Sequence, residues 1–422
     1  MIAFGWRVPA GLAFTFLLGG AGTARAAIVN GDPLEVAIAP PVDAVKFKEN
    51  TFEVSAADTY SYDDNIYRLA PSVTNLQLLA GIGPHATRQD HINTVTLAGD
   101  GAWNLGRQTF VADLRADDNR YNTNSNLNNV STNDKLIWNW NVGSLLSGQV
   151  GATYSNGLIS FVNSPNYSRN LYAVTNYYGA GRYQIGPHWA IFGGVLQSGT
   201  TLSDPALRAN DIHTKSVAFG SEFATSENDN LGAEYRYTDA RYPLGTALNN
   251  DYRENTARFV VRHAFSEKTK IDANFGFLKR SYASSTIASF SGDVWRVGVQ
   301  WKPTEKMQFE LDGWRNLQAY VTAQSDYFVG RGESISLRWL VTEKIAVSGS
   351  YMYESQNYIG GANQLLLGAR RDSLNTPLAG IKYTPFEFLV FDLGYSYERR
   401  NSNISNFQYN DHVISAKVTV KR

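Results

Sequence analysis

The stretch WRVGVQWKPTEKMQFELDGW, residues 295–314, alternates between apolar and polar side chains on both sides of a central turn. From Trp295 to Trp301 every second residue is apolar. The intervening residues, Arg296, Gly298 and Gln300, are charged, small or polar. Because successive side chains of a β-strand point to opposite faces, each half predicts a strand with one apolar and one polar face. A single hairpin of this kind also occurs in soluble sandwiches, so the fold depends on how often the pattern recurs.

The same period recurs from Thr51 to the end of the chain, and clear examples are residues 110–114, 146–154, 231–237 and 414–420. The segments are about ten residues long and are separated by Gly, Pro, Asn, Asp and Ser, a pattern that is typical of a transmembrane β-barrel.

The connections between these segments alternate in length. Outer-membrane barrels have short periplasmic turns, longer outer loops and an even strand number, so we expect an all-β, antiparallel transmembrane barrel of about 18 strands (16–20). Both termini are then periplasmic, in the outer membrane of a Gram-negative bacterium, and a barrel of this width encloses an aqueous channel. The short links are 104–108, 142–145, 184–188, 225–230, 265–269, 302–306, 341–344 and 384–387, and the long ones are 61–89, 117–132, 155–167, 199–212, 239–254, 280–291, 316–331 and 354–372.

The first residues have the composition of a targeting signal. Arg7 is followed by an apolar run, residues 11–20, which is too short to span a bilayer, and Ala24-Arg25-Ala26 fits a small-x-small cleavage site. We therefore expect a signal peptide at 1–26, a periplasmic N-terminal segment at 27–50 and a barrel at 51–422.

The composition excludes several classes of function. The 422 residues contain no cysteine, which rules out disulfides, thiol catalysis and cysteine metal sites. Lys plus Arg and Asp plus Glu both total 38, so the formal net charge is zero and no nucleic-acid partner is expected.

Several segments resemble the outer-membrane β-barrel proteins of exopolysaccharide-biosynthesis operons, the EpsL type associated with exosortase B and PEP-CTERM systems. The resemblance covers most of the chain after the signal peptide and implies an exit channel for a secreted exopolysaccharide. Its implied partners are the exopolysaccharide, outer-membrane lipid and lipopolysaccharide, and periplasmic polysaccharide-export components, without a cofactor. The segments are YDDNIYRL (62–69), GRQTF (106–110), WNWNVGSLLSG (138–148), WRVGVQWKPTEK (295–306) and YERRNSN (397–403).

Charged residues occupy the polar face of the central segments, and their signs alternate from one segment to the next. One interpretation is a set of cross-strand ion pairs that stiffen a wet wall, each contributing less than about 1 kcal/mol. The other is a path for sugars, because rings of charged side chains set pore selectivity. Since both signs occur, we expect a neutral or weakly charged polymer. These candidate lumen residues are Glu234, Arg236, Arg258, Arg262, Asp272, Arg296, Glu310, Asp312 and Arg338.

Asp63, Asp64 and Asn65 lie where the first strand meets its long loop, and Arg68 follows them. Three consecutive oxygen-bearing side chains can hold Ca²⁺, but the spaced ligands and the turn glycine of a calcium loop are missing. The favoured interpretation is that they cap the strand and pair with Arg68 or a neighbouring loop, so no metal site is predicted.

An enzyme is the main rival to a channel. Barrel hydrolases need a nucleophile or carboxylate paired with His, and no histidine of this chain lies in such a motif, so no catalytic residue is assigned. The second alternative is a general or sugar-selective porin. The six histidines are His85, His91, His188, His213, His263 and His412.

Overall fold

The computed structural model describes residues 50–74, 82, 86–163, 167–226, 229–245, 250–322, 325–360 and 369–422. The predicted signal peptide and almost all of the predicted N-terminal segment lie outside the described residues. Among the described residues, no helix is long and apolar enough to cross a membrane.

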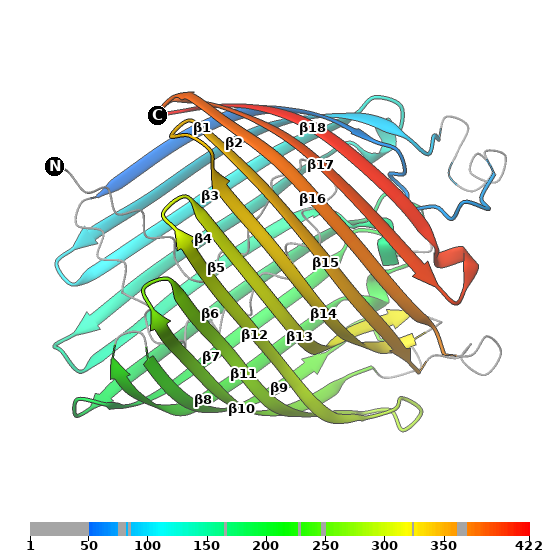
Figure 1. Cartoon of the computed structure of the whole chain (residues 1–422). Coiled ribbons are helices and arrows are strands. Elements are labelled where there is room, and N and C mark those ends of the chain that lie inside the picture. Colours follow the sequence, from blue (N-terminus) through cyan, green and yellow to red (C-terminus); the bar gives the residue numbers. More distant parts are fainter. Residues whose placement is uncertain are drawn as a thin grey trace.

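The described chain forms one antiparallel sheet of 18 strands that is closed on itself, as Figure 1 shows, which confirms the predicted fold class and strand number. Each strand pairs with its neighbours in sequence. The strands are β1 (Thr51–Asp63), β2 (Asp90–Leu105), β3 (Gln108–Tyr121), β4 (Asn129–Val142), β5 (Leu146–Leu158), β6 (Leu171–Ile185), β7 (Trp189–Leu202), β8 (Ile212–Ser226), β9 (Asp229–Arg241), β10 (Tyr252–Ser266), β11 (Thr269–Tyr282), β12 (Phe290–Thr304), β13 (Met307–Thr322), β14 (Ser325–Leu340), β15 (Ile345–Ile359), β16 (Arg371–Phe386), β17 (Leu389–Ser402) and β18 (Tyr409–Lys421).

The barrel closes where its first and last strands meet. β1 pairs with β18 from Ser55↔Lys421 to Asp63↔Val413, and it pairs with β2 on its other side. This seam leaves no sheet edge, so the strands can cross hydrocarbon with their backbone N–H and C=O groups paired.

The two faces of the wall differ in polarity. Large apolar side chains are exposed on the outer face, and their neighbours along each strand point inward. The exposed Trp residues and several exposed Phe residues lie toward the short turns, whereas exposed Tyr residues lie mostly from the middle of the strands toward the long loops, apart from Tyr183 and Tyr383, which lie near the short turns. The first group includes Trp103, Phe110, Trp138, Trp189, Phe265, Trp301, Trp339 and Phe388, and the second includes Tyr60, Tyr154, Tyr177, Tyr235, Tyr237, Tyr351, Tyr353 and Tyr395.

The short turns and long loops lie at opposite ends of the barrel. The start of β1 and the end of β18 lie at the short-turn end (Figure 1), where the Val54 N–H donates to the Arg422 carbonyl oxygen at 3.0 Å. In seven of the eight predicted long links the strands are joined by a connection longer than the short turns, although the strands run further into each link than predicted, as at 117–132, where β3 continues to Tyr121 and β4 begins at Asn129. The exception is 316–331, where β13 continues to Thr322 and β14 begins at Ser325. The loop prediction was wrong there because the two strands extend beyond the wall and pair with each other.

Candidate functional site

All nine candidate lumen residues occupy inward positions of β9 to β14. On β9, for example, Glu234 and Arg236 alternate with the exposed Tyr235 and Tyr237. The same alternation sets Arg258 against the exposed Phe259 on β10. Both signs of charge therefore line one continuous part of the inner wall.

The structure joins most of these residues in pairs between neighbouring strands. Arg258 Nη2 lies 2.7 Å from Glu234 Oε1, and Arg262 Nε lies 2.8 Å from Asp272 Oδ2. Arg296 Nη2 lies 3.0 Å from Asp312 Oδ1. Within the described part of the chain, Glu310 is not in an ion pair of this kind: its Oε1 accepts a hydrogen bond from Gln308 at 2.8 Å and one from Gln300 at 3.4 Å. Arg338 lies opposite Gln308 in the β13–β14 ladder.

The paired residues differ in their access to water. The side chains of Glu234 and Arg258 are 6% and 12% exposed, which makes this pair part of the packed wall. By contrast, Asp272 is 61% exposed and Arg296 is 53% exposed, so these charges can meet a passing solute. A role for any of the nine residues in a solute path remains a prediction.

Sequence reasoning missed further inward charges on β3 to β8. Arg182 on β6 forms an ion pair with Glu222 on β8, across the intervening strand β7. Near the β3–β4 pairing, Lys135 Nζ lies 3.6 Å from Asp113 Oδ2. The same alternation would have identified Asp113, which lies between the outward Ala112 and Leu114, whereas Lys135 and Glu222 each have a polar neighbour, Asp134 and Ser221, that weakens the pattern.

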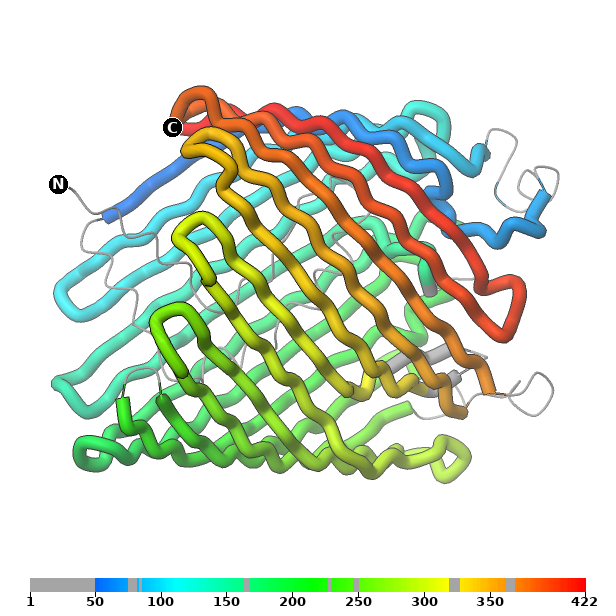
Figure 2. The backbone as a smooth tube through the Cα atoms, in the orientation of Figure 1, coloured from blue at the N-terminus to red at the C-terminus, as the bar shows by residue number. Residues whose placement is uncertain are grey.

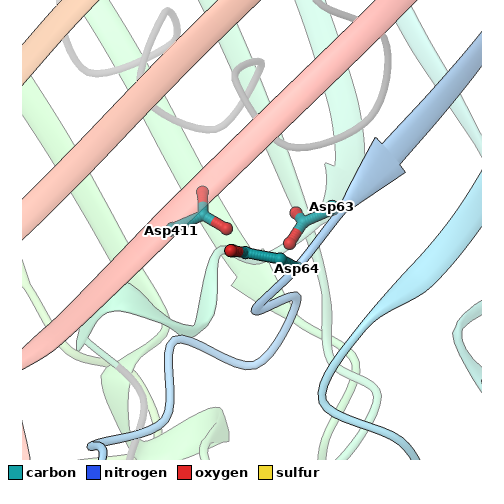
Figure 3. Close-up of side chains that lie close together, drawn as sticks. All are labelled: Asp63, Asp64 and Asp411. Carbon is teal, nitrogen blue, oxygen red and sulfur yellow. The ribbon is translucent and has the colours of Figure 1, made fainter.

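An arginine and three carboxylates meet at the loop end of the β1–β18 seam. Arg68 Nη1 lies 3.1 Å from Asp63 Oδ2, and Arg68 Nη2 lies 2.9 Å from Asp411 Oδ2. Figure 3 shows Asp64 beside these two aspartates, and Asp64 Oδ1 accepts the His412 backbone N–H at 2.7 Å. Asn65 contributes its amide, which donates to the carbonyl oxygens of Leu69 and Asn410.

The carboxylates of this cluster lie close enough together to be considered as cation ligands, since their oxygens fall within 4.8 Å of one another. The cation already present is the guanidinium of Arg68, whose side chain is 8% exposed. Burial acts to lower the pKa of Arg68, but the carboxylates of Asp63 and Asp411 raise it well above its ordinary value. The cluster therefore acts as an arginine-centred ion-pair network.

Loop residues form a small apolar core over this end of the barrel. The core comprises Ile66, Tyr67, Leu69, Ile92, Tyr121, Leu127 and Phe161. The Tyr67 and Phe161 rings lie 4.9 Å apart, and the Tyr67 hydroxyl donates to Asn124 Oδ1 at 3.1 Å. Arg400, on β17, donates a hydrogen bond to the Val162 carbonyl oxygen in the loop between β5 and β6. Loops that are distant in sequence are thus tied together across the mouth.

The extended β13–β14 hairpin also packs at the loop end, against the inner wall. Residues 327–330 are all buried, so both faces of this part of β14 are covered. The Tyr327 ring stacks on Tyr282 of β11 at 6.1 Å and meets Phe290 of β12 edge-on at 6.0 Å. Two strands separate β11 from β14 in the sheet, so the contact requires the hairpin to lean over the inner face of its neighbours, consistent with the path in Figure 2. The lumen is narrowed on this side.

Comparison with known proteins gives one family and a set of similar structures. The model of the family described as "Putative beta-barrel porin 2" matches residues 261–422. No curated protein matches the sequence. Solved structures that are similar include Pseudomonas aeruginosa OccK2 (OpdF) in complex with glucuronate, with 11% identity, a TM-score of 0.47 and coverage of 89% of this chain and 98% of that chain. Pseudomonas aeruginosa OpdQ has 11% identity, a TM-score of 0.45 and the same coverage.

Proposed function

We propose that this protein is a porin-like channel of the outer membrane that conducts small polar solutes passively. The observation that carries the proposal is a closed 18-stranded barrel with an apolar outer face and an inner face of both charge signs. A barrel of this strand number is wide enough for water. The porin family model supports the same class of function for residues 261–422.

The mechanism follows from the distribution of charge and of loops. Solvent-exposed residues of opposite sign, such as Asp272 and Arg296, offer hydrogen bonds to hydrated solutes without a strong preference for either ion sign. The β13–β14 hairpin limits the size of what passes. No bound cofactor takes part.

The direct test is reconstitution of the purified, folded protein in planar lipid bilayers, with heat-unfolded protein as the control. We expect stepwise conductance and weak ion selectivity, and swelling of proteoliposomes in neutral sugars up to a size limit. Folded barrels that give no conductance above the control would contradict the proposal.

Export of an exopolysaccharide is the second candidate, favoured by the sequence resemblance. Among the segments that carry this resemblance, residues 62–69 contribute Asp63 and Arg68 to the arginine-centred network at the mouth. Deleting the gene separates the candidates: an exporter predicts polymer retained in the periplasm, whereas a general channel predicts normal secretion. The porin match supports the general channel, so we place it first.

A further inference from the structure

The outer face of strands β2 to β8 has a groove of about 900 Å³. This volume falls within the range of about 300–1,000 Å³ that is usual for ligand sites. Small residues, among them Ala112, Ala152 and Gly179, interrupt a lining that is otherwise aromatic and aliphatic, including Trp138 and Val195. The missing side-chain volume at these positions accounts for a hollow in a surface that is otherwise convex.

The groove runs diagonally across the membrane-facing wall. It follows one row of cross-strand partners from Trp103, near the short-turn end of β2, to Val217, in the loop-side half of β8. At about 4.8 Å between strands, seven strands span about 29 Å. Because the strands of such barrels tilt by about 35–45°, this diagonal row descends about 17–20 Å along the membrane normal, a little more than one leaflet of a hydrocarbon layer about 30 Å thick.

The loop-side end of the groove is polar. Tyr177, Gln197 and Lys215 are direct partners on β6, β7 and β8, and all three belong to the groove lining. Their side chains are exposed on the outer face, where lysine is costly at the membrane mid-plane and tolerated near the interface. Lys215 lies only three residues into β8, at the interface end.

These three side chains carry hydrogen-bond donors that have no acceptor within the described part of the chain. The carboxylate opposite Lys215 in the ladder is Asp239, and it is occupied by Arg241 at 2.8 Å and by Arg253 at 3.7 Å. An ammonium, an amide and a phenol in one row thus face the membrane interface without a protein partner. The acceptor that complements them is anionic.

We propose that this groove binds an acylated, phosphorylated glycolipid of the outer leaflet. Its phosphate lies against Lys215, Gln197 and Tyr177, because a charge-assisted hydrogen bond from lysine is the strongest contact offered there. An acyl chain lies along the small residues at Ala152 and Gly179 and fills the hollow. The inference rests on the outer-membrane placement in the proposed function, but it is independent of the solute that passes through the lumen.

The test is native mass spectrometry of the full-length mature barrel, extracted from outer membranes in mild detergent and then supplied with purified lipopolysaccharide of the rough type. Two variants address the groove: Lys215→Gln removes the charge, and Ala152→Phe fills the floor. Lys279→Gln and Ala416→Phe are matched controls, since both residues are exposed on the outer face away from the groove. Channel conductance is measured in parallel.

We expect the wild type and both controls to retain the glycolipid equally and each groove variant to bind it about tenfold more weakly, because Lys215→Gln removes one charge-assisted hydrogen bond and Ala152→Phe fills the space of the acyl chain. Conductance should not change in any variant, which separates this test from that of the channel. Equal retention in all variants, retention of phosphatidylethanolamine in place of the glycolipid, or a self-associated barrel that Ala152→Phe dissociates would each overturn the proposal. Because the Lys215 side chain is exposed and makes no hydrogen bond or ion pair within the described part of the chain, Lys215→Gln should leave folding unchanged.

Discussion

Replacing Arg68 with alanine should destabilise the barrel, because it removes the positive charge that pairs with Asp63 and Asp411 at the loop end of the β1–β18 seam. The guanidinium contacts Asp63 at 3.1 Å and Asp411 at 2.9 Å, and these two carboxylates are 1% and 3% exposed. It also donates to the Asn65 carbonyl oxygen at 2.8 Å. Arg68→Ala therefore leaves two buried carboxylates facing each other without a counterion.

The expected loss follows from what buried ion pairs contribute when one partner is removed. Such changes cost about 3–5 kcal/mol, most of it from the charge that is left buried. With a urea slope of about 3 kcal/mol per molar, the unfolding midpoint should fall by about 1 M or more. The assay is urea unfolding of the folded barrel in detergent micelles, followed by tryptophan fluorescence and by the gel shift between folded and heated protein.

A surface ion pair supplies the matched control. Arg120 lies 2.9 Å from Asp118, but the two side chains are 60% and 40% exposed. Water screens such a pair, so Arg120→Ala should cost less than about 1 kcal/mol. Adding Asp411→Asn to Arg68→Ala should recover part of the loss, since it removes one of the stranded charges. If Arg68→Ala and Arg120→Ala shift the midpoint equally, the reasoning about the seam is refuted.

Three further predictions concern the lumen and the wall. Arg296→Glu replaces an exposed positive charge with a negative one and should move the reversal potential in a salt gradient toward cation selectivity; an unchanged potential would place Arg296 off the solute path. Gly220→Ala should lower the urea midpoint of unfolding, because the new Cβ would lie 2.2 Å from the Ala233 carbonyl oxygen. The control Gly193→Ala should be tolerated, because the atom nearest to its new Cβ is 3.4 Å away. Equal midpoints for the two variants would contradict this prediction. Tyr327→Ala removes two ring contacts of the leaning hairpin and should raise single-channel conductance, and a conductance equal to that of the wild type would show that the hairpin does not limit flow.

The strand number and the inward residues were predictable because both depend on local regularities. Side chains alternate along every strand, and loop lengths alternate along the chain, so a strand such as β12 fixes its own two faces. The assignment of Arg296 to the inner face and Trp301 to the outer face needed no tertiary information.

Contacts between residues distant in sequence were not predictable in the same way. The sequence suggests that Arg68 pairs with Asp63, five residues away, but nothing local identifies Asp411 as its second partner. The packing of Tyr67 on Phe161 depends on where two loops meet, and the lean of the β13–β14 hairpin depends on contacts with β11 and β12. Residues 316–331 were predicted to be a loop, but they contain apolar and aromatic residues such as Leu317, Tyr327 and Val329, and their two halves pair with each other.

The central claim is that lipid surrounds the wall and water fills the lumen, and single-site spin labels test it most directly. The chain has no native cysteine, so labels can be placed singly at two inward sites, Asp272 and Arg296, and at two outward sites, Phe275 and Trp301. In reconstituted bilayers, we predict that a water-soluble nickel complex relaxes the inward labels and that oxygen dissolved in lipid relaxes the outward ones. Outward labels relaxed by the nickel complex, or inward labels relaxed by oxygen, would contradict the account.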